Sequence, residues 1–260
     1  MAVVVATAPP AMAADLSGGF VPPAGSPVYA PQPMVIGHLS LGAGFWQNDD
    51  GLFSSDDTVG VFSGVGRANV NFGGDWNFEI ETGGQALFDS GNSFSSIGAA
   101  GHLWTRLNSA AVGIFGAADF PSGATVGTLG VEGETYFGDI TLGADASYSW
   151  SDGFGDFWSV GGWAGYYLTP DLRFGGALDY SAGDIPDTWT ASVDTEYRFS
   201  GTPFSAWGEV NYSNVSAGGG DVDIWSGLLG FRFFLDGGGT LQEHDQGVPW
   251  EGLLSTRVRF

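Results

Sequence analysis

From residue 35 onward, apolar and polar side chains alternate along the chain in segments of roughly ten to fifteen residues. In the segment 139–150, Ile140 and Leu142 fall on one face of an extended chain and Asp145 on the other. Successive side chains of a strand point to opposite sides, so a period of two indicates β-strands with one apolar and one polar face. Val193 and Asp194 show the same split in the segment 188–199.

Turn-forming residues separate these segments. The expected short turns are Gly73-Gly74, Leu107-Asn108, Phe137-Gly138, Thr169-Pro170 and Ser200-Gly201-Thr202. The intervening connections read as longer polar loops, such as 47–57 and 213–221. The predicted strands are 35–46, 58–72, 75–88, 94–106, 109–118, 125–136, 139–149, 157–168, 171–181, 188–199, 203–213 and 222–234. Short turns at one rim and longer loops at the other are typical of membrane barrels. We therefore predict an all-β fold, a closed antiparallel up-and-down transmembrane β-barrel of about 12 strands over residues 35–234.

Aromatic residues gather near both ends of the predicted strands, as expected where a barrel crosses the two interfaces of a bilayer. A soluble β-sandwich or propeller is the alternative, and it would hide its large apolar side chains in a core between sheets. The loop-end set is Phe45, Trp46, Phe88, Phe120, Trp150, Phe157, Trp158, Tyr180, Trp189, Tyr212 and Trp225, and the turn-end set is Phe72, Trp76, Tyr136, Tyr166, Phe174, Tyr197, Phe199, Phe204 and Phe231.

Charged residues fall on the polar face of these strands, which in a barrel lines the lumen. The predicted lumen-lining residues are Arg67, Glu79, Glu81, Arg106, Glu132, Glu134, Asp145, Arg173, Asp179, Asp194, Glu196, Arg198, Glu209 and Arg232. Carboxylates outnumber guanidinium groups, so we expect a polar, net acidic lumen.

Pairing the strands about their turns places opposite charges together. Arg67 is expected to face Glu79 or Glu81, and Arg173 to face Glu196. Two interpretations stay open. Salt bridges could fill and stiffen the interior, because a buried ion needs a partner. Alternatively, the excess carboxylates line a water-filled path that favours cations.

Composition and charge narrow the classes of partner. The chain of 260 residues has 7 basic residues, all Arg, against 29 acidic residues, which gives a formal net charge of −22. Because nucleic acids are bound by clustered Lys and Arg, we expect no nucleic-acid partner. No apolar run reaches the length of about 18 residues that a transmembrane helix requires, and there is no Cys.

Both ends of the chain differ from the alternating region. Residues 1–13 read as a truncated signal peptide with the small-x-small site Ala11-Met12-Ala13. Residues 14–34 are Pro-rich and are expected to form a periplasmic lead-in. Residues 235–260 form a C-terminal tail or closing segment, and we expect both termini in the periplasm. A membrane strand at 252–260 would make thirteen strands, whereas bacterial single-chain barrels have even numbers.

Signs of catalysis or of metal binding are weak. The three histidines are His38, His102 and His244, and neither a G-x-S-x-G motif nor a zinc-type His spacing occurs. We therefore expect no enzyme, no cofactor and no metal site. Acidic residues also cluster in the loops, and solvated loop charge is favoured over a calcium site because no full calcium-loop pattern is present. The first loop carries Asp49, Asp50, Asp56 and Asp57, and later connections carry Asp152, Asp156, Asp184, Asp187, Asp221 and Asp223.

The chain ends in Phe260 with Val258 and Leu254 at alternate positions before it, which resembles the C-terminal signal of bacterial outer-membrane proteins. With Ala11-Met12-Ala13 and the repeated hairpins, the sequence resembles bacterial outer-membrane β-barrel or porin-like proteins over nearly all its length. The resemblance implies the cell outer membrane of a Gram-negative bacterium. It also implies lipid, lipopolysaccharide and the barrel-assembly machinery as partners. The expected function is a passive channel for small hydrophilic solutes or cations. The alternative is a structural or adhesive surface barrel with a non-conducting lumen.

Overall fold

The computed structural model describes residues 35–48, 58–72, 75–88, 93–121, 123–153, 155–217, 220–235 and 239–248. The expected signal peptide, the lead-in, the acidic residues of the first loop and the Gly73-Gly74 turn lie outside the described residues, as does the segment 252–260. Among the described residues, no helix has both the length and the apolar character needed to cross a membrane.

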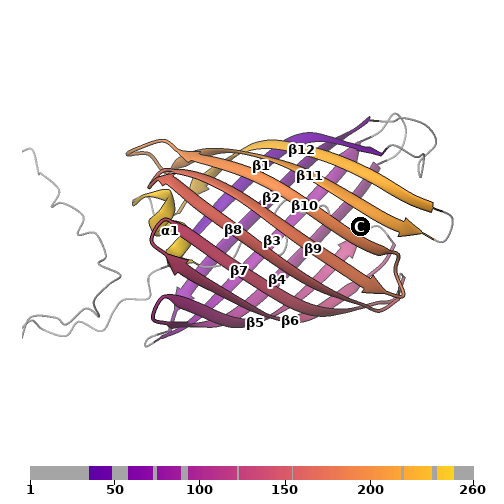
Figure 1. The fold of residues 1–260 in the computed structure, drawn as a ribbon, viewed down its shortest axis with the longest axis horizontal. Coiled ribbons are helices and arrows are strands. Elements are labelled where there is room, and N and C mark those ends of the chain that lie inside the picture. The colour runs from indigo at the N-terminus through magenta and orange to yellow at the C-terminus, as the bar shows by residue number, and fades with distance from the viewer. Residues whose placement is uncertain are drawn as a thin grey trace, which may run out of the picture. The chain divides into compact units, whose positions relative to one another are not determined.

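Twelve antiparallel strands form a closed barrel, in which each strand pairs with its neighbours in sequence (Figure 1). The predicted all-β, closed up-and-down barrel of twelve strands is confirmed. The strands are β1 (Val35–Asn48), β2 (Thr58–Asn71), β3 (Trp76–Phe88), β4 (Ser93–Leu107), β5 (Ala110–Pro121), β6 (Val126–Phe137), β7 (Ile140–Ser151), β8 (Phe157–Thr169), β9 (Leu172–Gly183), β10 (Asp187–Arg198), β11 (Phe204–Ala217) and β12 (Gly220–Phe234).

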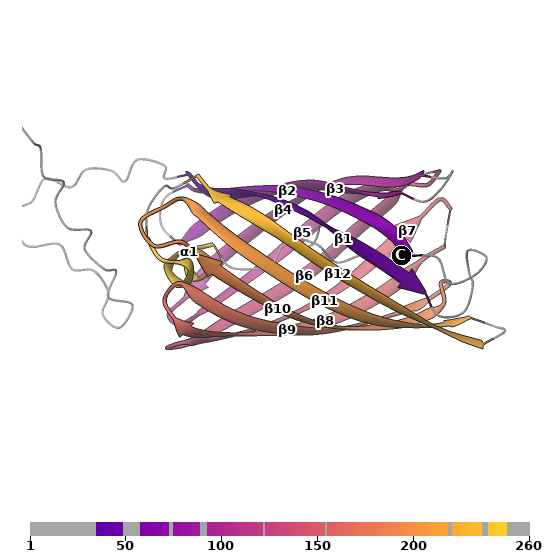
Figure 2. The same ribbon diagram turned by 90° about the horizontal axis from the view of Figure 1, so that it is seen from above.

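The barrel closes by pairing its first strand with its last. β1 and β12 are in register from His38 opposite Phe234 to Asn48 opposite Ile224 (Figure 2). The other edge of β1 pairs with β2. A closed barrel leaves no strand edge with unsatisfied backbone groups, which hydrocarbon could not hydrogen-bond.

The two faces of the strands differ as the alternation predicts. Val193 and Leu229 are 63% and 74% exposed on the outer face, and Trp189 and Ile140 are exposed there too. The side chain of Asp194, next to Val193, is only 13% exposed. A soluble sandwich would bury the first set and expose the second, so the soluble alternative is contradicted. The outer surface suits contact with lipid.

Connections between strands differ from the sequence-based expectation. Only residues 218–219 separate β11 from β12, because both strands continue pairing beyond 213 and 222, up to Ala217 opposite Gly220. The connection between β9 and β10 is also short, at 184–186, while the opposite rim has a five-residue turn at 199–203. The expected contrast between short turns and long loops is therefore wrong at these three connections. The two-residue turns at 108–109, 138–139 and 170–171 follow it, and so does the first loop, at 49–57, which is the longest connection.

Three residues assigned to the aromatic belts point inward instead, namely Trp46, Tyr136 and Phe157, whose register partner Ser149 is buried. Trp46 is 2% exposed and Tyr136 is 8% exposed, whereas the adjacent Phe45 and Phe137 face outward. Where two aromatic residues are adjacent at a strand end, composition alone predicts both of them at the membrane–water interface. The alternation of side chains admits only one of them to the outer surface.

A short helix, α1 (Leu241–Gly247), follows the last strand and lies at the turn end of the barrel (Figures 1 and 2). Its start is fixed by a capping box. The Glu243 amide donates to Thr240 Oγ1 at 3.2 Å, and the Thr240 amide donates to Glu243 Oε2 at 2.9 Å. A helix of 7 residues is too short to be stable alone, so its contacts with the barrel hold it in place.

Candidate functional site in the barrel interior

All the residues predicted to line the lumen are buried or half-buried in the structure. Arg67 on β2 is opposite Glu81 in the strand register, and its guanidinium reaches both expected partners on β3. Nη2 lies 2.5 Å from Glu79 Oε1, and Nε lies 3.8 Å from Glu81 Oε2. The expected facing of Arg67 and these two carboxylates is confirmed. The side chains of Glu79 and Glu81 are 0% exposed, so Arg67 offsets part of a large desolvation cost.

His102 on β4 extends this cluster toward β6. It lies opposite Glu79 in register, and its Nδ1 is 2.9 Å from Glu132 Oε1. Glu132 reaches it across β5 because Gly113 carries no side chain there. A Cβ on Gly113 would lie 3.1 Å from Glu132 Oε1. The intervening glycine is the feature that lets residues on non-adjacent strands meet.

A second ionic network lies on the opposite wall. Arg173 on β9 is in register with Glu196, as expected, but its Nη2 bonds Asp194 Oδ1 at 2.6 Å. Glu196 Oε2 instead lies 2.9 Å from Arg232 Nη1 on β12, and its other oxygen accepts a hydrogen bond from Ser205. The expected facing of Arg173 and Glu196 is therefore confirmed by the strand register, and the long Arg173 side chain also reaches diagonally to Asp194.

Asp145 and Asp179 flank a single glycine. Asp145 on β7 and Asp179 on β9 are both in register with Gly161 on β8. A Cβ on Gly161 would lie 2.6 Å from Asp145 Oδ1 and 2.5 Å from Asp179 Oδ1, so both carboxylates lean over the bare backbone. This brings two like charges together, an arrangement that attracts cations.

The remaining predicted residues make separate contacts. Tyr136 donates to Glu134 Oε2 at 3.5 Å, and Asn211 donates to Glu209 Oε1 at 2.7 Å. Arg106 and Arg198 both reach α1 and its cap, through the carbonyls of Gln246 and Thr240.

The helix α1 lies across the turn-end mouth of the lumen. The side-chain amide groups of Gln242 and Gln246 both donate to the Gly138 carbonyl in the turn between β6 and β7. On other sides of the mouth, Asp245 lies 3.6 Å from Arg173 Nη1 and 3.9 Å from Arg232 Nη1. These contacts place α1 over the ionic network. The helix could not be predicted from the hydrophobic pattern, because seven residues are too few to show a helical period.

His38 of β1 and His244 of α1 are in contact. His38 Nδ1 lies 3.2 Å from His244 Nε2, and both rings are buried. In the sequence His38 falls in the first predicted strand and His244 in the C-terminal segment 235–260, more than 200 residues away. Only the docking of α1 brings the two rings together.

A cavity remains between the ionic network and the wall that carries Arg67. It is partly open to solvent. Its charged lining residues are Arg67, Glu134, Arg173, Asp194, Glu196, Glu209, Arg232 and Asp245.

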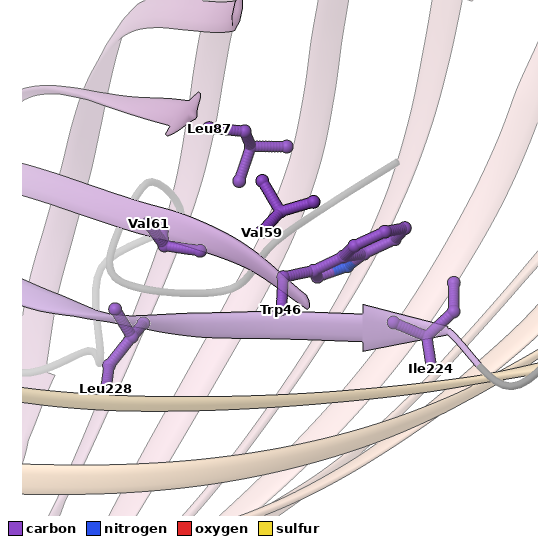
Figure 3. Close-up of a cluster of buried hydrophobic side chains, with 6 residues drawn as sticks. All are labelled: Trp46, Val59, Val61, Leu87, Ile224 and Leu228. Carbon is purple, nitrogen blue, oxygen red and sulfur yellow. The ribbon is translucent and has the colours of Figure 1, made fainter. Parts of the chain in front are cut away.

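The interior also has an apolar sector, which the expectation of a polar lumen did not include (Figure 3). The cluster comes from the loop ends of β1, β2 and β3 and from β12, with Phe94, Trp207, Val215 and Val222 packed against it. Its buried members are Trp46, Val59, Val61, Leu87, Ile224 and Leu228. The lumen therefore has an apolar wall near the loop end, where polar faces give way to Val, Ile and Trp.

Comparisons with known proteins agree on the fold. No protein-family model matches the sequence, and no characterised sequence is significantly similar to it. Among solved structures, an outer-membrane channel from Pseudomonas putida F1 is similar with a TM-score of 0.59 at 12% identity, over 80% of this chain and 99% of that one.

Two porins show the same likeness. The NanC porin has a TM-score of 0.56 at 12% identity, over 75% of this chain and 98% of its own. The KdgM porin, solved in complex with disordered oligogalacturonate, has a TM-score of 0.52 at 12% identity over the same shares. The chain thus has the fold of bacterial outer-membrane, porin-like barrels, which agrees with the resemblance found in its sequence.

Proposed function

We propose that this protein is an outer-membrane channel that passes small hydrophilic solutes and prefers cations. The observation that carries the proposal is the cavity lined by charged side chains inside a barrel whose outer face is apolar. Asp145 and Asp179, which lean together over Gly161, add negative potential to the interior. Rings of carboxylates in a pore favour cations in this way.

The same proposal assigns the chain to the outer membrane with both termini in the periplasm. Its neighbours there would be lipid and lipopolysaccharide, with the barrel-assembly machinery acting during biogenesis. The exposed apolar outer face supports the membrane location. The ionic interior is assigned to passive conduction, with no catalytic role for His38, His102 or His244.

A preference for cations sets this channel apart from the KdgM porin. That porin binds oligogalacturonate, which is a polyanion. In the present chain Glu134, Asp194 and Glu209 line the cavity, and so do Glu196 and Asp245. These five carboxylates outnumber the guanidinium groups of Arg67, Arg173 and Arg232 in the same lining, so small neutral or cationic solutes fit this surface better than a polyanion does.

The second candidate is a structural or adhesive barrel with a filled lumen. Two observations favour it: the ion pairs along the inner wall of the barrel and the position of α1 over the turn-end mouth. In that case the salt bridges stiffen the wall and no solute passes.

Planar-bilayer recordings of the purified full chain distinguish the two. A conducting channel gives discrete opening events, and under a KCl gradient its reversal potential has the sign of cation selectivity. The variant Asp145→Asn with Asp179→Asn should shift that potential toward zero, whereas Asp223→Asn, on the outer face next to Tyr212, should leave it unchanged. Absence of openings would support the filled barrel, and anion selectivity would refute the cation preference.

A further inference from the structure

The cluster around His102 combines three kinds of group that bind metals together. A carboxylate oxygen of Glu79, a carboxylate oxygen of Glu81 and a ring nitrogen of His102 lie within 4.8 Å of one another. All three side chains are 0% exposed. Two carboxylates and an imidazole are ligands that Zn²⁺ accepts, while Ca²⁺ and Mg²⁺ take oxygen ligands.

Two buried atoms in this cluster have no hydrogen-bond partner: Nε2 of His102 and Oε2 of Glu79. The Nδ1 atom of His102 is already bound to Glu132, and Oε1 of Glu79 to Arg67. A buried polar atom without a partner costs free energy, and native structures rarely leave two of them close together. A cation between these atoms would satisfy both.

Glu132 stands where a metal site needs a supporting group. In metal centres the ligating histidine usually donates its other ring N–H to a carboxylate, which fixes the tautomer and the orientation of the ring. Glu132 Oε1 is 2.9 Å from Nδ1 of His102, so a proton on Nδ1 leaves Nε2 as an acceptor for the metal. Arg67 positions Glu79 in a similar way, because it donates to Oε1 and leaves Oε2 available to a metal ion.

The formal charge of the cluster also suits a divalent ion. When the carboxyl groups of Glu79, Glu81 and Glu132 are ionised, they carry three negative charges against one positive charge on Arg67, while His102 with a proton on Nδ1 alone is neutral. An excess of two negative charges in a buried site is costly, and a divalent cation cancels it. Arg67 also lines the lumen cavity, which places the cluster beside the space from which an ion would enter.

From these observations we propose a site for a divalent transition metal of the Zn²⁺ type. Its ligands are His102 Nε2 and the carboxylates of Glu79 and Glu81, with Glu132 as a positioning residue and a position left open for water. Sequence spacing did not reveal it, because the ligands come from adjacent strands and Glu132 from two strands further on. The proposal does not depend on an open lumen.

The test is Zn²⁺ binding to the full chain, purified in detergent and stripped with a chelator. Titration in excess Mg²⁺ suppresses weak binding to the acidic loops. We expect one tight equivalent of Zn²⁺ that raises the unfolding temperature. His102→Ala should abolish it, and Glu132→Gln should weaken it by about 10–100-fold while retaining a hydrogen-bonding side chain. His38→Ala is the matched control, because it removes a buried imidazole that contacts His244 and lies outside the proposed site.

The outcomes are separable from those for conduction. Loss of the tight equivalent in His102→Ala and its retention in His38→Ala support the site, provided that both variants show the heat-modifiable gel migration of a folded barrel. If His102→Ala does not fold, the affinity of Glu132→Gln decides. No tight Zn²⁺ binding by the wild-type chain, or unchanged affinity in Glu132→Gln and His102→Ala, would overturn the proposal, whatever the conductance measurements show.

Discussion

Trp163 on β8 covers Gly143, its register partner on β7, so closely that a methyl group on Gly143 would overlap the indole ring. Gly143→Ala should therefore push the ring out of its position in the interior. Overpacking of this kind costs about 1–3 kcal/mol. The free energy of unfolding can be measured by urea titration in lipid vesicles with tryptophan fluorescence as the signal.

Gly165→Ala is the matched control for that measurement. Gly165 lies on the same face of β8, but the nearest atom to its added Cβ would be Arg173 Cδ at 3.5 Å, an ordinary contact. Stability should stay the same or rise slightly, since alanine reduces the freedom of the unfolded chain. Equal losses in both variants would show that Trp163 does not require the space above Gly143.

Arg67→Ala should destabilise the barrel strongly. The substitution removes the cation from Glu79 and Glu81, whose side chains are fully buried. Breaking a buried ion pair from one side costs about 3–5 kcal/mol, because a charge is left uncompensated. The midpoint of denaturant unfolding reports the loss.

A compensating variant tests that reason. Adding Glu79→Gln and Glu81→Gln to Arg67→Ala removes the uncompensated charges and should recover part of the stability. If the triple variant is no more stable than Arg67→Ala, the loss comes from packing of the arginine side chain rather than from charge.

Val193→Arg should impair insertion of the barrel into a bilayer. Val193 lies midway along β10 and is 63% exposed on the outer face. An arginine at the midplane of a membrane barrel costs about 2–4 kcal/mol. Folding yield into vesicles, measured by heat-modifiable migration, should fall. The neighbouring Ser192→Asn, on the inner face, should fold like the wild type.

Leu241→Ser should weaken the closure of the turn-end mouth by α1. Leu241 is 0% exposed and packs with Tyr167 and Phe234 of the barrel. Loss of a buried leucine side chain costs about 2–5 kcal/mol. A helix of 7 residues has too few other contacts to stay bound to the barrel after that loss. Single-channel conductance should rise. Leu235→Ser, at an exposed position, should leave conductance unchanged, and a rise in both variants would mean that the effect does not come from α1.

The barrel itself could be predicted because each strand meets two solvents. Val193 and Asp194 are adjacent in sequence, and the structure places one on the outer face and the other inside. The pairing of Arg67 with β3 followed from the strands and the turn between them. Both results depend on backbone geometry, which the alternation of side chains determines.

Contacts made by side chains over longer distances could not be predicted in the same way. Arg173 faces Glu196 in the strand register, but its side chain is long enough to reach Asp194 as well, and the register alone does not predict that contact. Glu132 reaches His102 only because Gly113 lies between them. Trp46 packs in the apolar cluster rather than at the rim. Composition alone could not distinguish it from the adjacent aromatic residue Phe45, which faces outward. The position of α1 depends on contacts with barrel turns that are distant in sequence, such as those at Gly138 and Pro170.

Pairing of β1 with β12 has a consequence for biogenesis. The ring is sealed by the strands that are synthesised first and nearly last, so the seam cannot form until almost the whole chain has been exported. Until then both end strands offer bare hydrogen-bonding edges, which are prone to aggregate. A chain of this topology therefore has to be kept from aggregating until the barrel closes. Weakening the β1–β12 pairing near His38 and Phe234 should lower the rate of barrel closure more than it lowers the stability of the closed barrel.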